Sequence, residues 1–111
     1  MLTTFIDAGV LKHRLVLEQV IETSDGSGGA IITWSEVATL WASIDSVHAA
    51  MRHLAQQSQE TITHRITLRY RKDVASGWRF RKGDRIFKII TVRDPDETGR
   101  YLVCRTEEEG R

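Results

Sequence analysis

Apolar and polar residues alternate most regularly along residues 61–71. Ile62, Ile66, Leu68 and Tyr70 occupy one set of positions, and Thr63, Arg65, Thr67, Arg69 and Arg71 occupy the other. Because successive side chains of a strand point to opposite faces, this pattern predicts a strand with one apolar and one basic face. We expect the apolar side chains to enter the core and the arginines to face water or a partner.

The amino-terminal part of the chain predicts a hairpin. Residues 13–22 alternate loosely, with apolar side chains on both sides, which is typical of a strand that is covered on both faces. Residues 23–29 combine turn-forming side chains with Gly26, Gly28 and Gly29. Glycine tolerates the positive φ of tight turns, so the chain is expected to reverse there, with a mobile loop at the tip.

The segment that follows the turn, residues 31–44, is long for a single strand and changes phase along its length. A bulge near residues 36–38 would reconcile the two phases. Trp34 and Trp41 lie on either side of this expected bulge. Because burial is the usual use of large aromatic rings, we expect both tryptophans in the core.

Residues 47–57 change to a helical spacing. Val47, Met51 and Leu54 fall on one face, and alanines favour a helix there. We therefore expect one short helix or helical loop between strands. Met51 and Leu54 could pack on the chain's own sheet or on a neighbouring subunit, and the sequence leaves both open.

Turn signals divide the carboxyl-terminal part into further strands. Gly77, residues 82–84 and Pro95 mark the turns, and strands are expected at residues 85–93 and 100–107. Several short strands with one helical insertion argue for a mainly β fold, an antiparallel sheet curled into a small barrel or sandwich. At 111 residues, the whole chain 1–111 is expected to be a single domain.

Charge and cysteine content limit the function classes. Sixteen basic and fifteen acidic residues give a formal net charge of +1, so any basic surface must be local. Cys104 is the single cysteine, which excludes an internal disulfide, and a buried residue is its expected role. The first residues lack a basic stretch followed by a long apolar run, so we expect a protein assembled in the cytoplasm, with no membrane partner.

No group of side chains in the sequence indicates catalysis. His13, His48, His53 and His64 lack the spacing of metal ligands, and no glycine-rich loop precedes a helix in phosphate-binding register. The acidic run at residues 107–109 is typical of a solvated tail. We therefore expect no catalytic residues, no metal, no cofactor and no enzymatic activity.

The arginines are the candidate binding residues. Arg65, Arg69 and Arg71 share one strand face, and Arg79, Arg81, Lys82 and Arg85 surround the next turn. Guanidinium groups suit carboxylates and phosphates alike, so the surface could be solvated, could contact an acidic protein neighbour, or could face DNA. Of the two binding interpretations we favour the protein interface, because a dedicated nucleic-acid binder usually carries excess positive charge and aromatic stacking platforms.

Four segments, in this order, resemble one protein family. They read AGVLKHRLVL (residues 8–17), WSEVATLWASI (34–44), TITHRITLRYR (61–71) and RFRKGDRIFKIITVRD (79–94). The order and spacing are similar to those of the head-closure, or head-tail joining, proteins of long-tailed phages and of gene transfer particles. The resemblance covers nearly the whole chain.

This resemblance implies a small β-barrel with a structural role in the virion. Family members form a ring, sixfold or twelvefold, beneath the portal and its adaptor ring, where they retain packaged DNA and dock the tail or tail-terminator protein. Packaged DNA could lie at the ring's lumen. The candidate interface residues are Arg65, Arg69, Arg71, Arg79, Arg81, Met51 and Leu54, with the glycine loop as an adjustable contact. The alternative is a small β-barrel module that binds nucleic acid.

Overall fold

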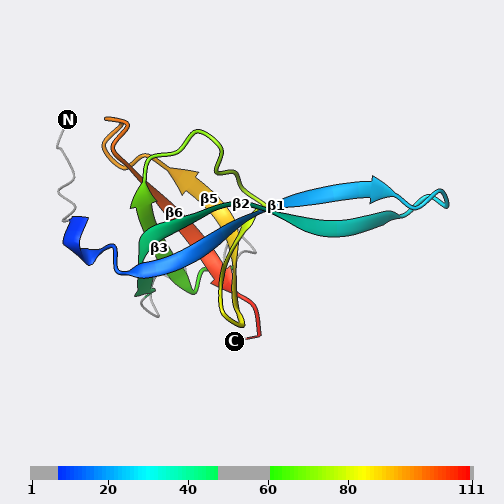
Figure 1. Cartoon of the computed structure of the whole chain (residues 1–111), viewed down its shortest axis with the longest axis horizontal. Helices are drawn as coiled ribbons and strands as arrows, with labels where there is room; N and C mark the ends of the chain where they lie inside the picture. Colours follow the sequence, from blue (N-terminus) through cyan, green and yellow to red (C-terminus); the bar gives the residue numbers. More distant parts are fainter. Residues whose placement is uncertain (1–7, 48–60, 111) are drawn as a thin grey trace.

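The computed structural model describes residues 8–47 and 61–110, which form a six-stranded antiparallel barrel (Figure 1). The elements are η1 (Ala8–Val10), β1 (His13–Ser24), β2 (Ala30–Ser46), β3 (His64–Arg69), β4 (Arg79–Lys82), β5 (Arg85–Arg93) and β6 (Tyr101–Glu108). The mainly β fold class is thus confirmed. The predicted helix at residues 47–57, with Met51 and Leu54, lies outside the described residues apart from Val47.

The strands close into a barrel in the order β1-β2-β3-β6-β5-β4. β4, which the sequence analysis did not anticipate as a strand, closes the ring by pairing with β1. Only three residue pairs make this contact: Val16 with Arg81, Leu17 with Phe80, and Glu18 with Arg79. Closure removes the free edges that an open sheet would expose.

The core lies inside the barrel and is built by alternation along each strand. Leu15, Leu17, Ile66, Phe80 and Phe87 are fully buried. The remaining buried members of the core are Ala42, Leu68, Ile89, Leu102 and Cys104. The prediction that Cys104 is a buried residue is therefore confirmed.

β3 confirms the predicted alternation in part. Ile66 and Leu68 are buried and Arg65 and Arg69 are exposed, as expected, but Thr67, predicted to lie on the same face as the arginines, is buried as well. Tyr70, which was predicted to face the core, is exposed instead. The strand ends at Arg69, so the alternation of β3 does not extend to the residues that follow.

The predicted bulge is confirmed where the first hairpin leaves the barrel. β1 pairs with β2 along its whole length, but the register shifts after Leu17, leaving Val37 as the extra residue between Ala38 and Glu36. Beyond this point the hairpin projects from the barrel as a two-stranded ribbon (Figure 1). We call residues 19–35 the arm.

The arm and the outer barrel wall expose apolar side chains that the sequence analysis expected to be covered. Ile31 and Ile32 on the arm are 52% and 47% exposed. Ile21 on β1 is 40% exposed, so the prediction of a first strand covered on both faces is wrong for its outer half. Trp41 was expected in the core and is 58% exposed. Its neighbour Ala42 points inward, and strict alternation therefore turns Trp41 outward.

Trp34 is half-buried, although it too was expected in the core. Its strand position lies beyond the bulge, where no barrel interior remains to receive the ring. Among the described residues, no helix is long and apolar enough to cross a membrane.

The contrast between barrel and arm gives a stability prediction. Leu17→Ala removes a fully buried side chain and should lower the free energy of unfolding by about 2–5 kcal/mol. Ile21→Ala, on the same face of β1 but in the arm, should change it by no more than roughly 0.5 kcal/mol. Urea denaturation followed by circular dichroism measures both. Equal losses would mean that the arm belongs to the core.

Candidate interaction surfaces

A buried carboxylate fixes the base of the arm. Glu18 is the first residue after the register shift, and its side chain is almost completely buried. Arg79 Nε donates a hydrogen bond of 2.7 Å to Glu18 Oε1, and Arg81 Nε donates one of 3.3 Å to Oε2. Desolvation by burial raises the pKa of Glu18, but the two guanidinium groups outweigh it and hold this pKa below its usual value.

Both strands of the arm are tied to β4 through the same two arginines. Arg81 Nη2 also donates a hydrogen bond of 2.9 Å to Glu36 on β2. The guanidinium of Arg79 lies 4.1 Å from the centre of the Trp34 ring, in a cation–π contact. Arg79 and Arg81, predicted as interface residues, thus hold the arm to its own barrel.

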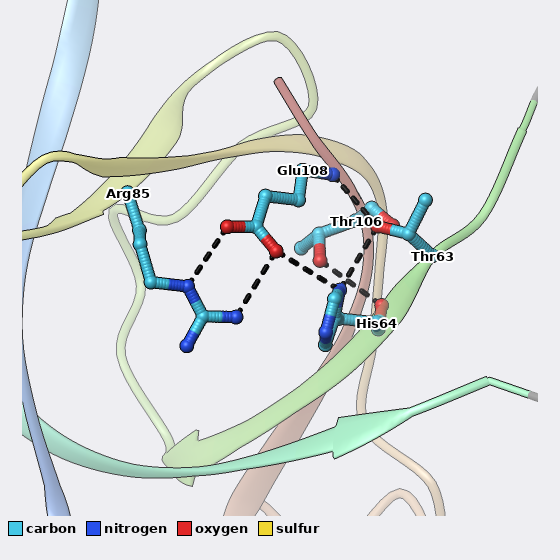
Figure 2. A network of polar contacts seen from close by, with 5 residues as sticks. All are labelled: Thr63, His64, Arg85, Thr106 and Glu108. Carbon is cyan, nitrogen blue, oxygen red and sulfur yellow. Dashed lines mark hydrogen bonds and ion pairs between the residues drawn. The ribbon is translucent and has the colours of Figure 1, made fainter. Parts of the chain in front are cut away.

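A second buried carboxylate lies near the end of β6 (Figure 2). The Glu108 side chain is only 2% exposed. Arg85 donates two hydrogen bonds to it, of 2.8 Å from Nε and 3.0 Å from Nη2. This bidentate bond raises the pKa of Arg85. The prediction of a solvated acidic tail at residues 107–109 is therefore wrong for Glu108.

The Glu108 backbone and its neighbours complete the cluster in Figure 2. The Glu108 N–H donates a hydrogen bond of 2.7 Å to Thr63 Oγ1, and Thr106 Oγ1 donates one of 3.0 Å to the carbonyl of His64. His64 Nδ1 lies 3.8 Å from Glu108 Oε1 and 3.0 Å from Thr63 Oγ1. The cluster ties β3, β5 and β6 together, so it serves the fold.

The arginines divide into two groups. Those that form ion pairs with carboxylates are Arg71, Arg79, Arg81, Arg85 and Arg100. Those without an ion pair among residues 8–47 and 61–110 are Arg14, Arg65, Arg69, Arg93 and Arg105. Arg71 was predicted to share the face of Arg65 and Arg69, but it lies beyond β3 and forms a bidentate bond with Asp73.

Four of the arginines without an ion pair lie on the outer barrel wall, two of them beside Trp41 and two of them four residues further along the sheet. Arg14 pairs with Trp41 across β1 and β2, and Arg65 pairs with Arg105 across β3 and β6. The register that pairs Ala42 with Leu68 brings the next residues, Trp41 and Arg69, side by side. We call Arg14, Trp41, Arg65, Arg69 and Arg105 the arginine face.

The glycine loop forms the tip of the arm. Asp25 Oδ1 accepts hydrogen bonds from the backbone N–H groups of Ser27, at 2.7 Å, and Gly29, at 3.1 Å. Gly26 and Gly28 have φ angles of 80° and 86°, which a side chain would disfavour. The expected turn is confirmed, and mobility of the tip stays a prediction.

Sequence reasoning missed Glu18 and Glu108. Glu108 could have been found, because it continues the buried series Leu102, Cys104 and Thr106 at every second position of β6. Nothing local marks Glu18, whose partners lie more than sixty residues away along the chain. Within the described residues, no group of three metal-binding side chains occurs.

Comparison with known proteins gives a family and several similar solved structures, two of which are the following. Residues 6–109 match the family model described as phage head completion protein. The solution structure of protein SF1141 from Shigella flexneri 2a is 28% identical, with a TM-score of 0.71, over 96% of this chain and 99% of that one. A chain of the virion of a native gene transfer agent particle is 27% identical, with a TM-score of 0.62, over 88% of this chain and 93% of that one. No curated protein matches significantly.

The cluster around Glu108 gives a second stability prediction. Glu108→Gln removes the charge that binds Arg85 inside the protein and should lower the free energy of unfolding by about 1.5–3 kcal/mol. Glu109→Gln, at the exposed next position, should change it by no more than roughly 0.5 kcal/mol. Chemical denaturation at neutral pH compares the two variants. Equal effects would place Glu108 in solvent.

The lowered pKa of Glu18 gives a prediction for acid. Because the folded-state pKa lies below the unfolded value, Glu18 contributes stability above the unfolded pKa, and this contribution is lost as pH falls through the folded pKa. Wild type should therefore lose more stability between neutral pH and pH about 3 than Glu18→Gln does. Denaturation midpoints across this range measure the difference. Glu22→Gln, which changes an exposed carboxylate of the arm, is the control and should keep the wild-type slope.

Proposed function

The chain belongs to the family of phage head completion proteins, and on that premise we propose that it closes the DNA-filled head of a tailed phage or gene transfer particle and joins it to the tail. The family match over residues 6–109 is the observation that carries this function. The structural likeness to a chain of a gene transfer agent virion supports a location in the particle.

We infer a structural role and not a catalytic one. Two Arg–carboxylate clusters, around Glu18 and Glu108, stabilise the barrel by joining its strands. Among residues 8–47 and 61–110, no ion pair uses the arginines of the arginine face, and the arm projects from the barrel. A rigid body with a projecting arm suits a component that is packed between other proteins of a particle.

The finer part of the proposal concerns arrangement. Copies of the chain would form a ring beneath the portal and its adaptor ring, retain the packaged DNA and present a platform to the tail. An exposed Trp41 beside Arg14 and Arg69 also suits stacking with bases, so DNA at the lumen of such a ring is the second candidate partner. A net charge of +1 favours protein partners over a dedicated nucleic-acid module.

The test is genetic, in the phage or prophage that encodes the chain. Deletion of its gene should leave filled heads and separate tails, or heads that have lost their DNA, and a plasmid copy of the wild-type gene should restore tailed particles. Electron microscopy and measurement of nuclease-protected DNA distinguish these products. Heads that never package DNA would indicate an earlier role, and normal tailed particles would exclude the proposed one.

A further inference from the structure

The arm has an acidic and a neutral face. Between residues 19 and 35 the charged side chains are Glu22 and Asp25, and no basic residue occurs. The register pairs Glu22 with Ile32 and Val20 with Trp34, and alternation puts these four side chains on one face, the acid face. The other face carries Ile21 and Ile31 with threonines, and it is the neutral face.

The arm is exposed because its own barrel does not reach it. The molecule measures 51 Å along its longest axis and 31 and 29 Å along the others, and the excess is roughly the length of six extended residues. A two-stranded ribbon alone in water is marginally stable, and solvent-facing isoleucines on it mark a contact surface. The arm points away from the barrel, so it cannot cover its own arginine face (Figure 1).

Glu22 is the carboxylate on the ribbon part of the acid face that is available to a partner. Glu18 and Glu36, at the base of the same face, are bound by Arg79 and Arg81 of their own chain. Glu22 has no ion pair among the described residues and is exposed, next to Ile32. The acid face thus offers one free carboxylate beside apolar side chains.

The arginine face offers the complementary chemistry. Arg14, Arg65, Arg69 and Arg105 are exposed without ion pairs in the described part of the chain. Trp41 supplies a large exposed ring beside Arg14 and Arg69. Tryptophan and arginine are the residues that most often dominate the energy of a protein interface. Asp45 lies opposite Arg65 and does not form an ion pair with it. The single carboxylate of Asp45 does not balance the arginines, so the face keeps excess positive charge.

We propose that the acid face of the arm of one copy docks on the arginine face of the next copy. Ile32 would cover Trp41, and Glu22 would reach an arginine beside it, with Arg69 the nearest candidate. Because the two surfaces lie on different parts of the same chain, the contact is head-to-tail. Repetition of such a contact forms a ring when the rotation between neighbouring copies closes. The inference rests on the proposed ring and adds the surfaces that build it.

Cross-linking within purified particles tests the contact. Thr39 is exposed on β2, two residues before Trp41 and on the same side of the strand. Particles that carry Ile32→Cys and Thr39→Cys in the same chain should give dimers and higher multimers with a short bis-maleimide. Cys104 does not compete, because burial raises the pKa of its thiol to about 12.

Two matched controls identify the surfaces. Ile31→Cys places the thiol on the neutral face at similar exposure, and combined with Thr39→Cys it should cross-link several-fold less. Asp84→Cys lies in the exposed turn between β4 and β5, away from the arginine face, and combined with Ile32→Cys it should give little product. Equal yields from Ile31→Cys and Ile32→Cys, or a preference for Asp84→Cys, would overturn the proposed pairing.

Charge reversal then tests the interaction itself. Glu22→Arg, added to the Ile32→Cys and Thr39→Cys chain, should lower the cross-linked fraction about tenfold, and adding Arg69→Glu should restore it. No restoration, with both variants folded by circular dichroism, would exclude the Glu22–Arg69 contact. Particles that contain the chain but yield no Ile32–Thr39 cross-link would overturn the docking inference alone. Absence of the chain from wild-type particles would overturn the proposed function.

Discussion

Closure of the barrel depends on the pairing of β1 with β4, where Glu18 sits between Arg79 and Arg81. β4 is four residues long and meets β1 through three residue pairs, so backbone hydrogen bonds alone give this seam little support. The carboxylate, held by two guanidinium groups, fastens the seam at its end. Without it, β1 and β4 would become free edges, and both would offer unpaired backbone groups to other chains.

The same contact sets the direction of the arm. The register shift after Leu17 releases the hairpin from the barrel, and the bond from Arg81 to Glu36 fixes the second strand at the same level. The cation–π contact of Arg79 with Trp34 supports β2 again, two residues further along the arm. An arm held at its base can project without being covered along its length. Exposure of its isoleucines is therefore a consequence of how the barrel is closed.

Much of the fold could be predicted from the sequence, because alternation and turn residues are local signals. The hairpin, the bulge and the basic strand were all visible in this way. Alternation separates two faces, however, and does not say which one is buried when both carry apolar groups, so Trp41 was placed inside. Glu18 and Glu108 were missed for other reasons. Glu18 is buried by arginines that are distant in sequence, which no local pattern reveals. Glu108 follows the buried alternation of β6, but its place in an acidic run led to the prediction of a solvated tail.

The division of the arginines explains how a nearly neutral chain can carry a basic surface. Five carboxylates form ion pairs with arginines of the same chain. They are those of Glu18, Glu36, Asp73, Asp96 and Glu108. Their pairing leaves the arginines of the outer wall without an ion pair in the described part of the chain, whereas the arm keeps its acidic side chains. Charge that balances over the whole molecule is thus separated in space, with acidic groups on the arm and basic groups on the barrel wall. In the proposed contact between copies, this separation of charge would favour one relative orientation over the others, which is the condition for a directed assembly.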